Sequence, residues 1–225
     1  HCAAYTNVDG AEADPDAAYA LNRDGARHVA EACHAVGAAM AFISTDYVFD
    51  GTADQPWQPD APTHPLGVYG QSKLAGELAV AGALAAHWIV RTSWLYGRGG
   101  KNFVDTMRKL AREKEELAVV DDQRGSPTWT VDLAEALGQL VMTHAYGTYH
   151  LTGSGDTTWC GLTRQFIALE GLPTRVRPIT TAELGRPAPR PAYSVLDHGM
   201  LKNANLAPLP AWEASLARYL ALAPV

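Results

Sequence analysis

The sequence is poor in the features that mark secreted and metal-binding proteins. Its 225 residues include three cysteines, Cys2, Cys33 and Cys160, which is an odd number without paired spacing. This favours a reducing, cytoplasmic location over a disulfide-stapled secreted scaffold. Cys33 adjoins His34, but no second ligand pair stands at zinc-finger spacing. We therefore predict no metal site.

Long apolar runs and an excess of basic residues are also missing. No stretch is apolar for long enough to cross a bilayer, and no basic-then-apolar leader opens the chain. The formal net charge of -6 argues against a general affinity for nucleic acid or anionic membranes. One anionic small ligand, held by local cationic side chains and backbone N–H groups, is compatible with this charge.

Helical and extended patterns alternate along the first 150 residues. The pattern predicts helices over 14–37, 65–86, 102–115 and 130–144, and strands over 38–44, 87–94, 116–121 and 147–154. Asp14 is the expected N-cap of the first helix, Pro15 its first residue and Gly37 its end. Such alternation predicts an α/β fold with a doubly wound, Rossmann-like parallel sheet. Ligands of such sheets bind beyond the carboxyl ends of the strands.

The stretch FISTDYVFDG, residues 42–51, places Ser44, Thr45, Asp46 and Tyr47 together at such a strand end. Ser93 and Trp94 follow the next strand in the same way. Polar side chains at neighbouring strand ends meet at one edge of a parallel sheet. These residues are therefore candidates for a ligand site.

Tyr69 and Lys73 stand at i and i+4, so they share one face of the predicted helix. A lysine ammonium favours the phenolate, so Lys73 is expected to lower the pKa of Tyr69 and make the phenol a usable acid or base. Thr45 could bind the same substrate oxygen while a nicotinamide exchanges hydride with a carbonyl carbon. A lone Tyr/Lys pair is more often ordinary packing, but here polar strand ends precede and follow the helix.

Several segments in order resemble the dTDP-4-dehydrorhamnose reductases, a branch of the extended short-chain dehydrogenase/reductase family. They are CAAYTNVD, ISTDYVFDG, PLGVYGQSKLAGE, RTSWLYG, NFVDTM, VVDDQRGSPT, YHLTGSG and RPAYSVLD. The resemblance implies reduction of the C4 ketone of a dTDP-4-dehydro-6-deoxy sugar by NADPH or NADH, with dTDP-L-rhamnose as the first expected product. It implies Tyr69 as proton donor, Lys73 as ligand of the nicotinamide ribose, and Thr45 as the group that polarises the ketone.

The resemblance also implies the remaining binding residues. Asp46, Trp94 and Asn102 are expected to join Thr45 in binding the sugar nucleotide, although an N-cap role explains Asn102 equally well. The cofactor-binding residues are expected to be Ala4, Tyr5, Thr6 and Ile43, together with Tyr69 and Lys73. Arg190 is a candidate phosphate ligand, whereas Trp57, Trp129, Trp159 and Trp212 are assigned to packing.

A glycine fingerprint for dinucleotide binding is missing from the sequence. GSGDTTW and GRGGKN each lack part of the pattern. In the family comparison HCAAYT corresponds to the end of the fourth strand. The Rossmann-like domain, residues 1–150, is therefore expected to be N-terminally incomplete, with a smaller substrate lobe at 151–225.

Two alternatives remain beside the rhamnose-pathway reductase. One is a non-catalytic regulatory or scaffolding relative of the same fold, which the missing glycine loop favours. The other is a reductase of a different nucleotide-deoxysugar, because a fold does not determine its substrate. The expected partners are the dTDP-sugar substrate and, as an option, a second copy in a homodimer.

Overall fold

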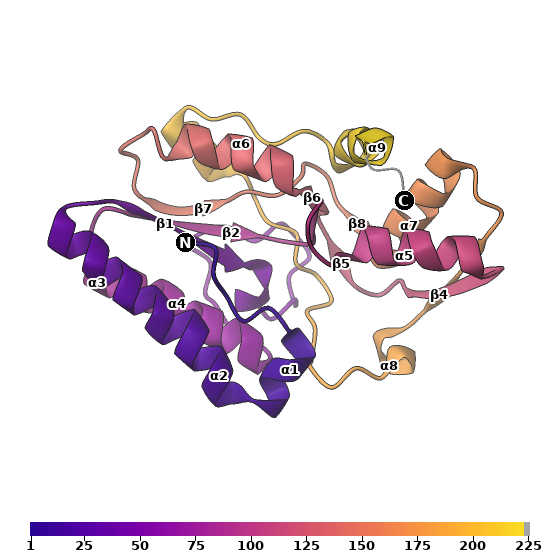
Figure 1. Ribbon diagram of the computed structural model, residues 1–225, viewed down its shortest axis with the longest axis horizontal. Helices are drawn as coiled ribbons and strands as arrows, with labels where there is room; N and C mark the ends of the chain where they lie inside the picture. Colours follow the sequence, from indigo (N-terminus) through magenta and orange to yellow (C-terminus); the bar gives the residue numbers. More distant parts are fainter. Residues whose placement is uncertain (223–225) are drawn as a thin grey trace.

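The computed structural model describes residues 1–222, and a three-stranded parallel sheet lies at its centre (Figure 1). The strands lie in the order β1-β2-β7, comprising β1 (Met40–Thr45), β2 (His87–Thr92) and β7 (Gly147–His150). Thr45 pairs with Thr92, so β1 and β2 end level with each other. The α/β fold with a parallel sheet is thus confirmed.

Helices cover both faces of this sheet. On one face, α3 (Ala26–Val36) and α4 (Val68–Ala83) pack on β1, and Phe42 lies in their shared apolar cluster. On the other face, α6 (Thr130–Leu140) covers the sheet, and Ile43 packs into that cluster. Successive strand side chains point to opposite faces, so an unbroken apolar run serves both helical layers.

The predicted helix over 14–37 is one helical segment with a π-helical middle. It comprises α2 (Pro15–Tyr19), a π-helical stretch (Ala20–Gly25) and α3. As predicted, Asp14 caps the segment and Pro15 is its first residue, and Gly37 ends it with φ 69°. A left-handed φ of this kind favours glycine, which has no Cβ.

A second group of elements packs beside the sheet around its own apolar cluster. β4 (Glu116–Val120) pairs in parallel with β9 (Arg175–Ile179), not with the central sheet as the alternation suggested. Around them lie α5 (Phe103–Glu113), α7 (Trp159–Glu170) and α9 (Trp212–Leu222), as seen on the right of Figure 1. This cluster joins residues from both sides of position 150. The division at residue 150 stays a prediction.

The remaining elements are short and connect these two groups. They are α1 (Val8–Ala13), β3 (Leu95–Tyr96), β5 (Arg124–Gly125), β6 (Thr128–Trp129), β8 (Thr157–Thr158), α8 (Thr181–Leu184) and 3-10 turns at Asp46–Val48 and Gly199–Ala204. Among residues 1–222, no helix is long and apolar enough to cross a membrane.

Candidate active site

The end of β1 and the start of α4 bring Thr45 and Tyr69 together. Thr45 is the last residue of β1, and Tyr69 lies in the first turn of α4. A Cβ on Gly70 would lie 2.2 Å from the carbonyl oxygen of Tyr47, so only glycine allows the helix this close to the strand end. The Thr45 hydroxyl lies beside the Tyr69 phenol and lowers its pKa. Two residues predicted to be catalytic are therefore neighbours.

The predicted effect of Lys73 on the pKa of Tyr69 is wrong. Burial raises the pKa of Tyr69 to about 12, the neighbouring Thr45 hydroxyl lowers it, and the nearby Asp46 carboxylate raises it. The Lys73 amine does not lower it, because it points to the carbonyl oxygen of Ile43. With this pKa, Tyr69 keeps its proton at neutral pH and can act as a proton donor.

Lys73 is held against the strand that carries Thr45. Its Nζ donates a hydrogen bond of 2.6 Å to the carbonyl oxygen of Ile43 and lies 4.2 Å from the ring centroid of Phe42. Its side chain is almost entirely buried, which lowers its pKa to about 8, while the Glu77 carboxylate raises it. An ammonium with that pKa remains mostly protonated at neutral pH.

The segment with the expected cofactor residues Ala4, Tyr5 and Thr6 is fixed by a buried asparagine. Asn22 accepts from the Tyr5 N–H at 2.8 Å and donates to the Tyr5 carbonyl at 3.2 Å. It also donates to the Ser72 hydroxyl of α4 at 2.9 Å. The π-helical stretch that places Asn22 thus ties this segment to the helix of Tyr69 and Lys73.

An open cavity of about 560 Å3 adjoins these residues through Tyr47, whose ring meets that of Tyr69 edge-on at 5.6 Å. Three cationic side chains line it: Lys101, Arg186 and Arg190. Burial and the Asp46 carboxylate raise the pKa of the Tyr47 hydroxyl, and the nearby Arg190 guanidinium lowers it. Asp9 also lines it, together with apolar and aromatic side chains: Phe103, Met107, Leu110, Val119, Trp159 and Leu184. A ligand with an anionic group and a flat ring would match the cationic and the aromatic side chains.

Trp94 and Trp159 stack face to face next to this cavity. Their ring centroids are 3.6 Å apart with an interplanar angle of 8°. Trp94 has a left-handed φ of 48°, a costly conformation for a bulky residue that is often found at functional sites. Trp159, which the sequence assigned to packing, lines the cavity and donates to Gln123 at 3.1 Å.

Residues 1–224 match the protein family described as RmlD substrate binding domain. The chain belongs to this family.

Relatives of this RmlD-family chain have closely related sequences and structures. The dTDP-4-dehydrorhamnose reductase of Streptomyces griseus is 50% identical over 223 residues, covering 96% of this chain and 73% of that protein. The dTDP-4-keto-6-deoxy-D-glucose reductase of Streptomyces niveus is 43% identical, covering 97% of this chain and 76% of that protein. The crystal structure of dTDP-4-dehydrorhamnose reductase from Bacillus anthracis with NADP superimposes with a TM-score of 0.97 at 43% identity, covering 99% and 79% of the two chains.

A buried ion pair that sequence reasoning missed lies beneath the site of this RmlD-family chain. Arg91 of β2 binds Glu77 of α4 through two hydrogen bonds of 2.9 and 2.7 Å. Glu77 also accepts from the Ser44 hydroxyl at 2.5 Å, and Arg91 donates to the Pro59 carbonyl at 3.0 Å. The only sequence signal was a glutamate one turn after Lys73, because burial of a charge has no pattern of its own.

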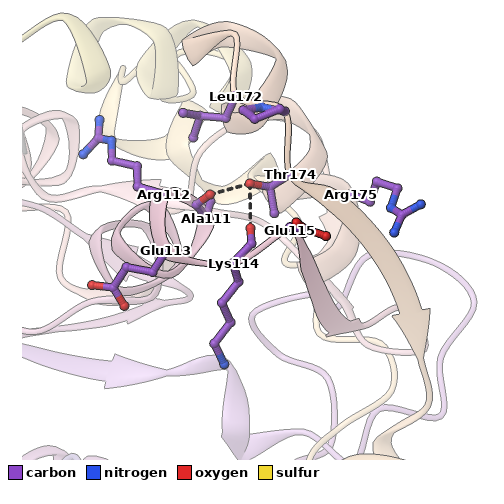
Figure 2. A pocket seen from close by; sticks show the side chains of 9 residues that line it. Ala111, Arg112, Glu113, Lys114, Glu115, Leu172, Thr174 and Arg175 are labelled. Atoms are coloured by element: carbon purple, nitrogen blue, oxygen red, sulfur yellow. Dashed lines mark hydrogen bonds between the residues drawn. The ribbon is translucent and has the colours of Figure 1, made fainter.

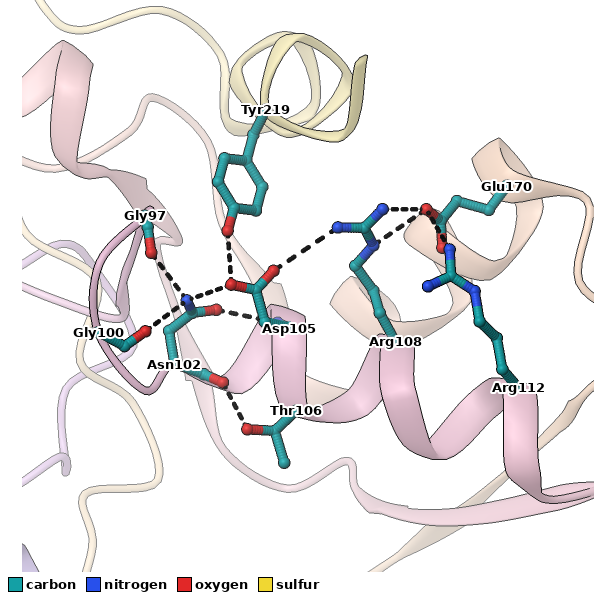
Figure 3. Close-up of polar contacts among 9 residues, drawn as sticks. All are labelled: Gly97, Gly100, Asn102, Asp105, Thr106, Arg108, Arg112, Glu170 and Tyr219. Atoms are coloured by element: carbon teal, nitrogen blue, oxygen red, sulfur yellow. Dashed lines mark hydrogen bonds and ion pairs between the residues drawn. The ribbon is translucent and has the colours of Figure 1, made fainter. Parts of the chain in front are cut away.

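Asn102 has the N-cap role that competed with substrate binding. Its Oδ1 accepts from the Asp105 N–H at 2.9 Å, and its Nδ2 donates to Gly97, Gly100 and Asp105 (Figure 3). Asp105 accepts in turn from Tyr219 and pairs with Arg108. Asn102 lines the cavity, but its amide groups organise the loop before α5. A direct substrate contact of this side chain stays a prediction.

Another groove, of about 680 Å3, lies at the far end of α5 and contains none of the predicted site residues. Its walls are the stretches 111–115 and 172–175, and Thr174 donates to the carbonyls of Ala111 and Lys114 (Figure 2). Cationic and anionic side chains alternate around it. The groove therefore shows no selectivity for a ligand of one charge.

Asp46 is a buried carboxylate next to the hydroxyls of Thr45 and Tyr69. It accepts from Thr45 at 3.1 Å through Oδ1, whereas its buried Oδ2 has no hydrogen-bond partner among the described residues. Burial raises its pKa from 3.8 to about 6, and the nearby Ser194 and Thr45 hydroxyls lower it. Because the folded-state pKa exceeds the unfolded one, the stability that Asp46 contributes is greatest at low pH and is lost as pH rises through about 6.

Replacing Asp46 with Asn should therefore stabilise the protein above pH 6. The expected gain is roughly 2–3 kcal/mol, because the pKa rises from 3.8 to about 6 and each pKa unit corresponds to about 1.36 kcal/mol. The gain should shrink towards pH 4, and urea unfolding at several pH values would measure it. Asp50→Asn is the matched control, for which a change in stability of the opposite sign is expected. Hydrogen bonds from Thr52 lower the Asp50 pKa, so this variant should lose stability at neutral pH. A pH-independent effect of Asp46→Asn would contradict the prediction.

Proposed function

We propose that this chain is an NADPH-dependent reductase of the C4 ketone of a dTDP-4-dehydro-6-deoxy sugar. The preferred candidate substrate is dTDP-4-dehydro-L-rhamnose, whose reduction gives dTDP-L-rhamnose. The observation that carries the proposal is that Thr45, at the end of β1, lies beside Tyr69 of α4, next to a cavity lined by Lys101, Arg186 and Arg190. The names of the relatives from Streptomyces griseus and Bacillus anthracis support it.

The residues near Thr45 fit the nicotinamide ribose of NADPH. Lys73 uses one of its three N–H donors on Ile43 and can offer the others to ribose hydroxyls. Ala4, Tyr5 and Thr6 would pass along the cofactor, since Asn22 holds their backbone close to α4. The proposed contribution of Ile43 is its backbone, whose carbonyl holds Lys73. When bound, the cofactor supplies the hydride that is added to the ketone carbon.

The proton reaches the ketone oxygen from Tyr69. The phenol keeps its proton until charge develops on that oxygen, because burial disfavours the phenolate in the free site. Thr45 turns its one hydroxyl proton from Asp46 to the same oxygen and stabilises its developing charge. Lys73, whose amine points to the Ile43 carbonyl, acts instead on the nicotinamide ribose. A water-poor strand end strengthens all three interactions.

The cavity would bind the nucleotide part of the substrate. Arg190, Arg186 and Lys101 would hold the diphosphate, since guanidinium groups pair well with phosphate oxygens. The Trp159 ring, stacked on Trp94, would pack against the flat base or the sugar. Asp46 would use its free Oδ2 to accept from a sugar hydroxyl.

The direct test is to follow NADPH oxidation with two substrates, dTDP-4-dehydro-L-rhamnose and dTDP-4-keto-6-deoxy-D-glucose. We expect turnover to be faster with dTDP-4-dehydro-L-rhamnose. Mass spectrometry and NMR would identify the sugar product. Faster turnover of the glucose derivative would favour the alternative that the chain reduces a different nucleotide-deoxysugar. The name of the Streptomyces niveus relative supports this alternative. Binding of both ligands without turnover would favour the non-catalytic relative. A cytoplasmic location and a homodimer remain part of the proposal.

A further inference from the structure

The short helix α1 connects three parts of the site. It follows directly after the cofactor-side segment Ala4–Thr6, and Asn7 caps it by accepting from Gly10 at 3.0 Å. A Cβ on Gly10 would lie 2.8 Å from the Tyr5 hydroxyl, so the helix fits closely over this segment. It also packs on α4. Any displacement of α1 would thus be transmitted to the Tyr5 side chain.

Asp9 joins α1 to the cationic wall of the cavity. Its carboxylate accepts from Arg190 at 3.0 Å and from Arg186 at 3.4 Å, and the Ala188 N–H donates to it at 3.3 Å. Arg190 also donates to the Ala188 carbonyl at 2.9 Å. Asp9 and Arg190 are three-quarters or more buried, so solvent screens this pair less than a surface pair. The loop 186–190 and α1 are therefore held together.

Glu12 joins α1 to the helix that carries Tyr69. Its Oε1 accepts from the Val68 N–H at 2.8 Å, one residue before Tyr69. The N-cap residue Gly67 has no side chain to fill this role, and a Cβ there would lie 2.6 Å from Glu12 Oε1. Glu12 thus satisfies an otherwise free donor at the start of α4 from a neighbouring helix.

We propose that α1 couples cofactor binding to sugar-nucleotide binding, with Asp9 and Glu12 as positioning residues; this rests on the function proposed above. A diphosphate on Arg190 restrains the arginine and, through Asp9, restrains α1. The cofactor restrains the Tyr5 segment at the other end of the same helix. Each ligand thereby orders a part of the chain that the other ligand also needs, and this makes binding of the second ligand tighter.

The coupling can be measured as the Kd of NADPH by fluorescence titration, without and with saturating dTDP. We expect dTDP to tighten NADPH binding about fivefold or more in the unmodified protein, and NADPH to tighten dTDP binding by the same factor. In Asp9→Asn, which keeps the shape but loses the charge, the factor should fall below about twofold while the Kd of NADPH alone stays the same. Asp14→Asn is the control, because Asp14 caps α2 and Asn also caps well.

Each outcome of this titration has one meaning. If the unmodified protein binds both ligands without coupling, or Asp9→Asn keeps full coupling, the role of α1 is wrong and the reductase proposal stands. If the unmodified protein binds neither ligand, both proposals fail. Thermal unfolding of each variant without ligand shows whether a loss of coupling between the two ligands is caused by unfolding. A variant that has the melting temperature of the unmodified protein but shows no coupling supports the proposal.

Glu12 gives a second, independent test. Glu12→Ala removes the acceptor for the Val68 N–H, so kcat should fall about tenfold or more with KM almost unchanged, as expected for misplacement of Tyr69. Glu12→Gln keeps an oxygen acceptor and should restore most of kcat. If Gln does not rescue, or if both variants equal the unmodified protein, the positioning role of Glu12 is overturned.

Discussion

Replacing Tyr69 with Phe is expected to lower kcat for ketone reduction by about 10²–10⁴-fold, the usual contribution of a positioned general acid. The phenol is in contact with Thr45, and burial keeps it protonated until the ketone oxygen needs the proton. Phe retains the ring that packs edge-on against Tyr47, so the fold should be preserved. Steady-state kinetics with NADPH and the keto sugar nucleotide would measure the loss, and NADPH titration would show that binding survives.

Tyr19→Phe is the matched control for this experiment. Tyr19 lies at the end of α2 beneath the Arg23 guanidinium, and removing its hydroxyl should leave kcat within twofold. Activity of Tyr69→Phe within tenfold of the unmodified protein would contradict the proposed proton donor. A loss confined to KM would also contradict it, because a group that acts only in the transition state changes kcat.

Replacing Glu77 with Gln should lower the free energy of unfolding by about 3–5 kcal/mol. The Glu77 and Arg91 side chains are 4% and 6% exposed, so the variant leaves a guanidinium charge buried without a carboxylate. The hydrogen bond from Ser44, which precedes the proposed catalytic residue Thr45, changes as well. Urea unfolding followed by circular dichroism would measure the difference.

Glu31→Gln is the comparison for the buried pair. Glu31 pairs with Arg27 at 3.3 Å, but both side chains are about half exposed, so the loss should stay below about 0.5 kcal/mol. The double variant Glu77→Leu with Arg91→Leu should recover part of the stability, because no charge is then left buried alone. A loss below about 1 kcal/mol in Glu77→Gln would show that water or another group solvates Arg91.

The local elements could be predicted because their signals are short-range. Asp14, Pro15 and Gly37 bound a helical segment through capping and backbone conformation, which depend on a few neighbouring residues. The helix α1 was missed, because six residues are too few to show a helical repeat of apolar positions. β4 was misplaced because a strand pattern does not state its partner, and β4 pairs with β9 at a long sequence separation.

The sequence by itself determined the α/β fold, the strand-end cluster around Thr45, and the helical pair of Tyr69 and Lys73. Each of these follows from periodicity or from spacing within one element. Only the tertiary structure decided the direction of the Tyr69 pKa shift, the Glu77–Arg91 pair and the contacts of α1. Desolvation and ion pairing depend on which distant segments exclude water from a group, and that is a property of the packed chain.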